Sequence, residues 1–372
     1  MSPARPTVGV DLRALVRRPS GIGWYTLALL TRLARRGAAR YLGLSHRPTV
    51  ADDRLREAGV ALECETAPLG SWWQQLVTPP RLAAGDVDLF WSPLSVLPAL
   101  LPVPGVVTVH DLTPLLFPES HSLKVRLSMA PLLRRTVRTA ARVVADSRAT
   151  AGDLAARYPA CRGRLTVIYP GVDPEFRPAP AAEIAAVRTE LGLPEGYLLS
   201  TATLEPRKNL GRLLDAWEEL AAGDAGFPPL VLCGGYGWRS RRLLERIRGL
   251  EGRGLAWLGH LPRERLVRVF QGALAFVYPS LYEGFGLPVA EAMACGLPTL
   301  ASNRSSLPEV LGDAGILFDP EDRRELSVAL RRVVSDAALR AELGERARER
   351  SRRFDWDDSA RRMEEVFAAV LG

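Results

Sequence analysis

Short apolar segments alternate with helix-forming segments along almost the whole chain, and this alternation restricts the possible folds more than any other feature of the sequence. Strands of a parallel sheet are joined by helices and buried on both faces, so they read as short apolar runs between helical segments. We therefore predict an α/β protein with parallel sheets covered by helices on both faces. The predicted strands lie near residues 7–11, 88–91, 105–110, 143–146 and 165–169, and near 197–202, 229–233, 255–258, 274–278, 298–301 and 315–317.

A proline-rich stretch separates two such units. Four prolines fall between residues 170 and 180, and a helical pattern over 181–191 follows them. We place the domain boundary here, with one Rossmann-like domain over 1–176 and a second over 177–355. Ligands of open α/β sheets bind at the carboxyl ends of the strands, so the two sheets predict a site in a cleft between their carboxyl edges.

Length and composition favour a cytoplasmic protein. At 372 residues, 47% of them hydrophobic, the chain is long enough for two cores of ordinary size. Its four cysteines are widely spaced and form no metal-ligand pattern, which favours a reducing compartment. Residues 1–6 are short and polar and lead directly into a strand, so no signal peptide is predicted. Residues 89–109 carry no charge, but four prolines interrupt them, which predicts two strands and a turn instead of a membrane span.

Positive charge is concentrated in the first half of the chain. Residues 1–178 hold 23 Lys/Arg against 14 Asp/Glu, a net charge of +9, whereas residues 179–372 have a net charge of −2. The segment 122–142 combines six basic residues with apolar ones and is predicted to be an amphipathic helix. Such a helix either lies on an anionic membrane surface, here the inner face of the cytoplasmic membrane, or is simply a solvated basic face. No stacking aromatic residues alternate with these arginines, so nucleic acid is not an expected partner.

A glycine loop between a strand and a helix carries two carboxylates in the second half. The predicted strand at 274–278 is followed by Glu283, Gly284 and Gly286, and then by Pro288 at the expected start of a helix that contains Glu291. The N–H groups and positive dipole end of such a helix suit a phosphate group. The alternative is an ordinary connection with two solvated glutamates. A lone charge in an otherwise uncharged helix favours the functional interpretation, in which both carboxylates face one bound molecule.

A second candidate site follows the predicted strand at 197–202. Arg207 and Lys208 stand where this strand ends and a helix begins, at the edge where α/β sheets bind ligands. Only two of the 49 basic residues are lysines, so a lysine next to Arg207 suggests that a compact ammonium group is needed there. The pair is predicted to bind a diphosphate and to stabilise its charge as it leaves. The alternative is a solvated start of a helix.

Two features of the first half are expected to face the same cleft. Gly21 and Gly23 open a helix over 24–35, where backbone N–H groups can approach a phosphate, although the pattern is not a dinucleotide fingerprint. His110 ends the predicted strand at 105–110 and so points toward the cleft, although a lone histidine at the end of a strand is more often structural.

Several motifs together resemble retaining glycosyltransferase family 4, which has the GT-B fold. The resemblance extends over almost the whole chain. The motifs that carry it are Ser20–Tyr25, Val109–Leu112, Tyr169–Asp173, Phe176, Glu205–Asn209, Cys233–Trp238, Tyr278–Gly286 and Ser302–Val310. It implies two Rossmann-like domains that face each other across a cleft, an acceptor-binding first domain, a donor-binding second domain, and a terminal helix within 356–372 that returns to the first domain.

The resemblance also implies the role of each residue in a hexosyl transfer with retention of configuration. Arg207 and Lys208 would take up the charge of the leaving diphosphate, Glu283 would bind sugar hydroxyls, and His110 would contact the sugar near the reacting carbon. Further contacts to the donor would come from the ribose-binding Glu291 and from the backbone at Gly21, Gly23, Gly284, Phe285, Gly286 and Leu287. The resemblance implies no metal or other cofactor. Asp86 and Asp88 match an Asp-x-Asp metal pattern, but they precede a strand instead of following one, so we interpret them as a loop and the start of that strand.

The motifs most resemble those of mannosyltransferases that build bacterial surface polysaccharides such as lipopolysaccharide. GDP-mannose is therefore the first expected donor, ahead of UDP- and dTDP-sugars, and a lipid-diphosphate-linked glycan is the expected acceptor. Two alternatives remain open. A nucleotide-sugar 2-epimerase would need an acid/base set that the sequence does not show. A catalytically weak sugar-nucleotide-binding or assembly protein would be favoured by loss of Arg207, Lys208 or Glu283, all of which are present.

Overall fold

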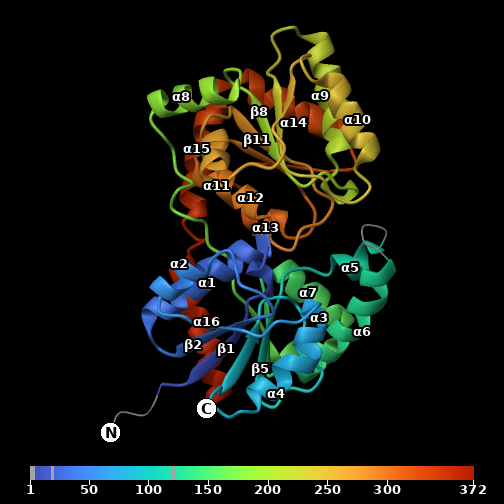
Figure 1. The fold of residues 1–372 in the computed structure, drawn as a ribbon. Coiled ribbons are helices and arrows are strands. Elements are labelled where there is room, and N and C mark those ends of the chain that lie inside the picture. Colours follow the sequence, from blue (N-terminus) through green and yellow to red (C-terminus); the bar gives the residue numbers. More distant parts are fainter. Residues whose placement is uncertain (1–4, 18–20, 119–122) are drawn as a thin grey trace. The chain divides into compact units, whose positions relative to one another are not determined.

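The computed structural model describes residues 5–17, 21–118 and 123–372, and they form two compact units (Figure 1). The first unit holds the described residues up to Leu116, residues 123–171 and Asp355–Gly372; the second holds Val172–Phe354 together with Phe117 and Pro118. The first four residues of the polar N-terminus, Ser20 of the first motif and the start of the predicted basic helix lie outside the described residues.

The first unit is built on a seven-stranded, all-parallel sheet with the order β3-β2-β1-β4-β5-β6-β7. Its strands are β1 (Thr7–Asp11), β2 (Arg40–Ser45), β3 (Ala61–Cys64), β4 (Leu89–Ser92), β5 (Gly105–Val109), β6 (Arg142–Ala145) and β7 (Leu165–Val167). Five of them are the predicted strands, and the sequence analysis missed β2 and β3. A glycine interrupts the apolar run of β2, because a Cβ at Gly43 would lie 2.4 Å from the Leu12 side chain. The edge strand β3 has no fully buried residue and so lacks an apolar signal.

Helices cover both faces of this sheet. They are α1 (Gly21–Arg36), α2 (Asp52–Glu57), α3 (Gly70–Trp72), η2 (Trp73–Val77), α4 (Thr78–Leu82), α5 (Thr113–Leu116), α6 (Leu123–Thr139), α7 (Arg148–Arg157) and α16 (Trp356–Leu371), with 3₁₀ turns η1 (Arg13–Leu15) and η4 (Pro159–Arg164). The predicted basic helix corresponds to α6, which ends three residues earlier than expected because the chain enters β6 at Arg142.

The terminal helix α16 belongs to the first unit, as the resemblance implies. In Figure 1 this red helix lies among the blue and cyan elements of that unit, beside α1. Phe367 of α16 packs on Trp91 of β4, with ring centroids 6.0 Å apart, and the Ser359 hydroxyl donates to the Tyr169 carbonyl at 2.6 Å. Both rings are buried in the apolar core that α1 and α16 form with the sheet.

The second unit repeats the scheme with a six-stranded parallel sheet of order β10-β9-β8-β11-β12-β13. All of its strands were predicted: β8 (Leu198–Thr201), β9 (Leu230–Cys233), β10 (Leu255–Trp257), β11 (Ala275–Tyr278), β12 (Thr299–Ser302) and β13 (Ile316–Phe318). Its helical elements are α8 (Ala181–Leu191), η5 (Pro206–Lys208), α9 (Leu210–Gly223), α10 (Arg241–Leu250), α11 (Arg263–Gln271), α12 (Leu287–Ala294), α13 (Leu307–Leu311), α14 (Arg323–Ser335) and α15 (Ala337–Ser351). The α/β fold of two parallel-sheet units is thus confirmed.

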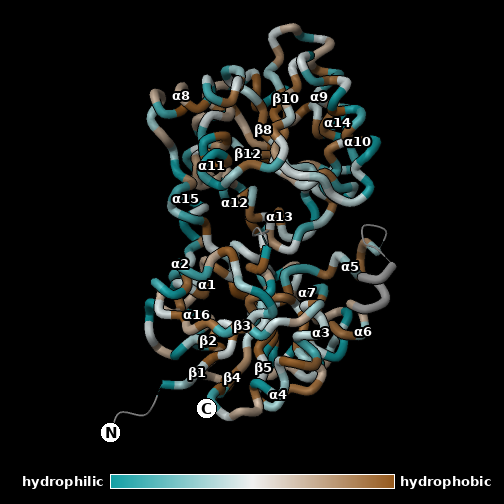
Figure 2. Tube along the Cα trace, viewed as in Figure 1, coloured by the Kyte–Doolittle hydropathy of each residue, from teal (hydrophilic) through white to brown (hydrophobic). Residues whose placement is uncertain are grey.

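Hydrophobic residues gather on the strands and on the inner sides of the helices in each unit (Figure 2). In the second unit, α9 and α14 bury their apolar sides against the sheet. The sheet order sets β8 beside β11, and β11 beside β12. Parallel pairing therefore brings the loops after these three strands to one edge of the sheet, where the candidate residues of this unit lie.

The uncharged stretch 89–109 forms β4, an irregular connection and β5, as predicted. Among the described residues, no helix combines the length and the apolar composition needed to cross a membrane.

Candidate active site

Glu283 lies at the centre of a buried polar cluster at the carboxyl edge of the second sheet. One carboxylate oxygen accepts hydrogen bonds from the Lys208 ammonium and the Ser280 hydroxyl, both at 2.6 Å, and the other lies 3.2 Å from the Arg207 guanidinium. Burial alone would raise the pKa of the Glu283 carboxyl, but the charges of Lys208 and Arg207 outweigh it and lower the pKa to about 2. The structure thus joins three residues that the sequence analysis singled out in two separate motifs.

The two cations are held by further partners. The Arg207 guanidinium donates to the Glu205 carboxylate at 2.6 Å and to the Tyr282 carbonyl at 2.5 Å, and the Lys208 ammonium donates to the Tyr278 hydroxyl at 2.9 Å. The side chains of Arg207 and Lys208 are only 12% and 11% exposed. Both cations therefore have fixed positions without a ligand, which is the arrangement that electrostatic stabilisation of a developing charge requires. Glu205, which helps to fix Arg207, was not among the predicted site residues.

The loop from Gly284 to Leu287 makes a tight turn into α12. Gly286 has a φ of 98°, and a Cβ at this position would lie 2.6 Å from the Leu307 side chain, so the turn needs glycine. Two hydroxyls from the loop after β12 hold it: Ser305 and Ser306 both donate to the Glu283 carbonyl, and Ser306 also lies 2.8 Å from the Phe285 carbonyl. The two serines belong to a motif found in the sequence, but no local pattern predicts that they hold this loop.

Glu291 belongs to a different cluster from Glu283. It lies in α12, and its carboxylate is 3.4 Å from the guanidinium of Arg263, which also pairs with Asp173 at 2.5 Å and lies over the ring of Phe176. Burial raises the pKa of the Glu291 carboxyl to about 7, although Arg263 opposes this effect. The structure records no contact between Glu283 and Glu291, and that both face one ligand remains a prediction.

His110 follows β5 in the first unit, and both of its ring nitrogens have oxygen partners. Nδ1 lies 2.5 Å from the Asp146 carboxylate after β6, and Nε2 lies 2.7 Å from the Pro93 carbonyl after β4. A carbonyl can only accept, so Nε2 carries a proton. Burial alone would lower the pKa of the His110 imidazole, but Asp146 and the Pro93 carbonyl raise it, which favours the imidazolium form. Asp146 was not predicted; its position directly after a buried strand was the available signal.

The remaining predicted residues of the first unit are at the expected places in its elements. Gly21 is the first residue of α1, and Gly23 is buried in the first turn of that helix. Asp86 pairs with Arg81 at 2.7 Å, and Asp88 accepts from the Thr7 backbone N–H at 2.7 Å, so both carboxylates of the Asp-x-Asp pattern have partners within the protein.

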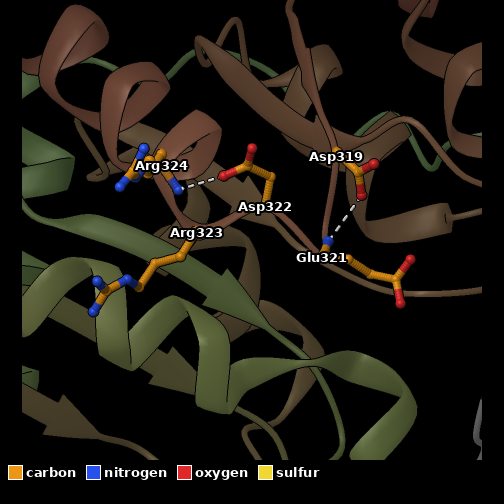
Figure 3. Close-up of a pocket in the computed structure, with 5 residues that line it drawn as sticks. All are labelled: Asp319, Glu321, Asp322, Arg323 and Arg324. Atoms are coloured by element: carbon orange, nitrogen blue, oxygen red, sulfur yellow. Dashed lines mark hydrogen bonds between the residues drawn. The ribbon is translucent and has the colours of Figure 1, made fainter.

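A large open hollow of about 570 Å³ lies elsewhere in the second unit (Figure 3). It is lined by the charged turn from Asp319 to Arg324, where Asp322 caps α14 through the Arg324 backbone N–H at 2.7 Å. None of the predicted site residues lines it. We attribute this hollow to the turn before α14 and not to a binding site.

The comparisons with known proteins agree with this geometry. Residues 19–176 match the family described as Glycosyltransferase Family 4, and residues 185–350 match the family described as Glycosyl transferases group 1. The O-antigen chain mannosyltransferase B of Escherichia coli is 31% identical over 356 residues, which cover 91% of this chain and 93% of that protein. The serotype-specific mannosyltransferase WbdA of Escherichia coli is 35% identical over 196 residues, 51% of this chain but only 24% of that protein.

A solved structure has the same fold. HepE from Anabaena in complex with UDP and glucose has a TM-score of 0.78 and 21% identity, with 98% of this chain and 100% of that chain covered. The two Rossmann-like units, this structural match and the two family matches show a glycosyltransferase of the GT-B class. The relative that is 31% identical over nearly its whole length and the two family matches show that the chain belongs to glycosyltransferase family 4.

Proposed function

We propose that this glycosyltransferase transfers mannose from GDP-mannose, with retention of configuration and without a metal, to a lipid-diphosphate-linked glycan of a cell-surface polysaccharide. The observation that carries the proposal is the cluster of Arg207, Lys208 and Glu283, in which two largely buried cations flank an ionised carboxylate. The choice of mannose is supported by the two mannosyltransferase relatives, one of which acts on the O-antigen chain.

The cluster suits the charges that develop during glycosyl transfer. As the bond between the sugar C1 and the diphosphate breaks, the electron pair stays on the phosphate oxygen, where Arg207 and Lys208 stabilise it. The N–H groups at the start of α12 add to this stabilisation. Glu283, ionised and fixed, accepts hydrogen bonds from the sugar hydroxyls, and Glu291 accepts from the ribose.

We propose neither carboxylate of this cluster as a nucleophile, because Glu283 is held in place by Lys208, Arg207 and Ser280, and Glu205 by Arg207. We therefore propose that the acceptor hydroxyl attacks C1 on the face from which the diphosphate leaves. Attack on this face retains the configuration at C1. The proton of the acceptor hydroxyl passes to the departing phosphate oxygen. For His110 we propose the role that the resemblance implies, contact with the sugar near C1; Asp146 and the Pro93 carbonyl hold its ring in one orientation.

We further propose a cytoplasmic enzyme that works at the inner face of the membrane. A lipid-linked acceptor and a soluble nucleotide sugar can meet only at such a surface. The net charge of +9 on residues 1–178 suits the anionic diphosphate of the acceptor.

A thermal-shift screen tests the donor assignment. The purified protein is heated with GDP, UDP, ADP and dTDP and with their sugars, with EDTA present. A ligand at a hundredfold excess over its Kd stabilises the native state by about 2.7 kcal/mol. We expect a selective shift with GDP and GDP-mannose. The donor assignment fails if a UDP- or dTDP-sugar gives the larger shift, and the enzyme assignment fails if no nucleotide gives one.

The stereochemistry is tested on the reaction product. With GDP-mannose, an axial α-linked donor, NMR of the new linkage should show an α-mannoside. A β-linked product would exclude the same-face mechanism.

A further inference from the structure

The first unit has an exposed apolar face that glycosyl transfer does not explain. No charged residue occurs between Glu65 and Arg81, and residues 70–82 form the consecutive helices α3, η2 and α4. Their inner side is buried in the core through Trp73 and Gln74. Three large apolar side chains are exposed here: Leu69, directly before α3, is 47% exposed, and Trp72 and Leu76 within the helices are 58% and 69% exposed.

A second uncharged segment extends this face. Leu100, in the connection between β4 and β5, is 74% exposed. The backbone N–H of Ala99 donates to the side-chain oxygen of Gln75 at 2.8 Å, which fixes this connection beside the helical run. Leu100 and Leu76 are the direct chain neighbours of the two bonded residues. We call Leu69, Trp72, Leu76 and Leu100 the apolar face.

Arginines of α6 border the apolar face. The Arg135 guanidinium donates to the Ala99 carbonyl at 2.5 Å, so α6 lies directly against the connection that carries Leu100. Arg134 and Arg138 are exposed on the same helix. The border is therefore cationic, whereas the two segments that form the face carry no charge.

We propose that the apolar face is a membrane-contact surface whose leucines and tryptophan enter the boundary region of an anionic bilayer while Arg134, Arg135 and Arg138 bind lipid phosphates. A tryptophan and leucines beside basic residues are the composition that binds such interfaces. Each cation near an anionic surface adds to the attraction. Four side chains are too few for a stable protein interface, which buries about 1,200 Å² or more in total. The proposal draws its biological sense from the proposed lipid-linked acceptor, but binding to lipid does not depend on the donor or on catalysis.

Vesicle co-sedimentation of the full chain tests the surface. We expect binding to vesicles of phosphatidylcholine with 30% phosphatidylglycerol, weaker binding at high salt, and much weaker binding to phosphatidylcholine alone. The double variant Trp72→Ser/Leu76→Ser should lower the partition coefficient by about tenfold, since it removes two of the four inserted side chains. The variant Arg134→Gln/Arg138→Gln should lose the preference for phosphatidylglycerol. The matched control is Val328→Ser, an equally exposed apolar residue (65%) on α14 of the second unit, which should bind like the wild type.

Three results would overturn the proposal: no binding of the wild type to either vesicle, equal binding of Trp72→Ser/Leu76→Ser and wild type, or equal loss in Val328→Ser. A concentration-dependent dimer in lipid-free solution that the Trp72/Leu76 variant disrupts would instead make the face a contact between copies of the chain. The thermal shift with GDP-mannose separates this proposal from the proposed function, because the Trp72/Leu76 variant should keep that shift. Vesicle binding without any nucleotide shift would refute only the function.

Discussion

Replacing Lys208 with methionine removes the nearer of the two cations that hold Glu283 while it keeps most of the side-chain volume. The pKa of Glu283 is lowered from its ordinary value near 4.5 to about 2, and the charge of Lys208 is the larger lowering influence, ahead of Arg207. At 1.36 kcal/mol per pKa unit, this shift corresponds to about 3 kcal/mol of stability at neutral pH. The variant should therefore lose about 2 kcal/mol, since Arg207 and Ser280 still hold the carboxylate.

The catalytic loss should be larger than the loss of stability suggests. Removing one fixed charge donor from a transition state costs roughly 10²–10³ in rate, so kcat with the donor should fall by that factor while the variant remains folded. Adding Glu283→Gln to Lys208→Met neutralises both members of the buried pair and should recover most of the lost stability. It should recover no activity, because the cation needed at the leaving diphosphate is still missing.

Circular dichroism on heating and a nucleotide-release assay on the wild type, both single variants and the double variant measure the two effects separately. The wild type should lose stability as the pH falls from about 4.5 through about 2, because the depressed folded pKa of Glu283 makes its stabilising effect present only above that window. Lys208→Met should lose less across the same window. Wild-type activity in Lys208→Met, or recovered activity in the double variant, would refute the assignment of Lys208 to the leaving group.

Three further predictions follow from single contacts. Asp146→Asn should lower the pKa of the His110 ring, measured by NMR titration, because it removes the carboxylate that raises it. In the wild type the stabilising effect of this pair is present below the unfolded pKa near 6.5 and is lost as the pH rises through the higher folded value. A ring whose pKa is the same in both proteins would refute the pairing. Gly286→Ala should lower the stability by about 1–3 kcal/mol in thermal unfolding, because φ is 98°, whereas the control Gly249→Ala, within α10 with open space around its Cβ, should raise the stability by about 0.5–1 kcal/mol. Nucleotide affinity, measured by calorimetry between pH 5.5 and 8.5, should rise through about pH 7 as Glu291 ionises, and Glu291→Gln should remove this rise. An affinity of the wild type that does not change with pH would refute the assignment of Glu291 to the ribose.

Most of the fold could be predicted because buried parallel strands leave a strong local signal. All strands of the second unit read as apolar runs. The missed strand β2 contains Gly43, whose missing side chain makes room for Leu12 from a distant part of the chain, and β3 lies at the edge of its sheet with little burial. The Leu12 contact of β2 and the edge position of β3 both depend on the tertiary structure and not on the local sequence.

The candidate site, too, could be predicted only in part. Arg207, Lys208 and Glu283 could be found from their positions after strands, since the carboxyl ends of adjacent parallel strands meet. The contact partners that shift the pKa values of His110 and Glu291 could not be predicted from the sequence. Asp146 lies 36 residues from His110, and Glu291 pairs with Arg263, which lies 28 residues earlier in the chain, instead of with the first cluster. Local patterns show which residue types gather at an edge, but not which of them touch.

The helix α16 makes the first unit discontinuous in the chain, with a consequence for how the protein is made. Every residue of the second unit precedes α16 in the chain, so much of the core of the second unit can form during synthesis while the first unit still lacks one wall of its own. Until Trp356 and Phe367 arrive, apolar residues of α1 and β4 stay open to water or to a chaperone. Contacts between residues so far apart in sequence form slowly. The unit whose synthesis begins first thus cannot complete its core until α16 has been made.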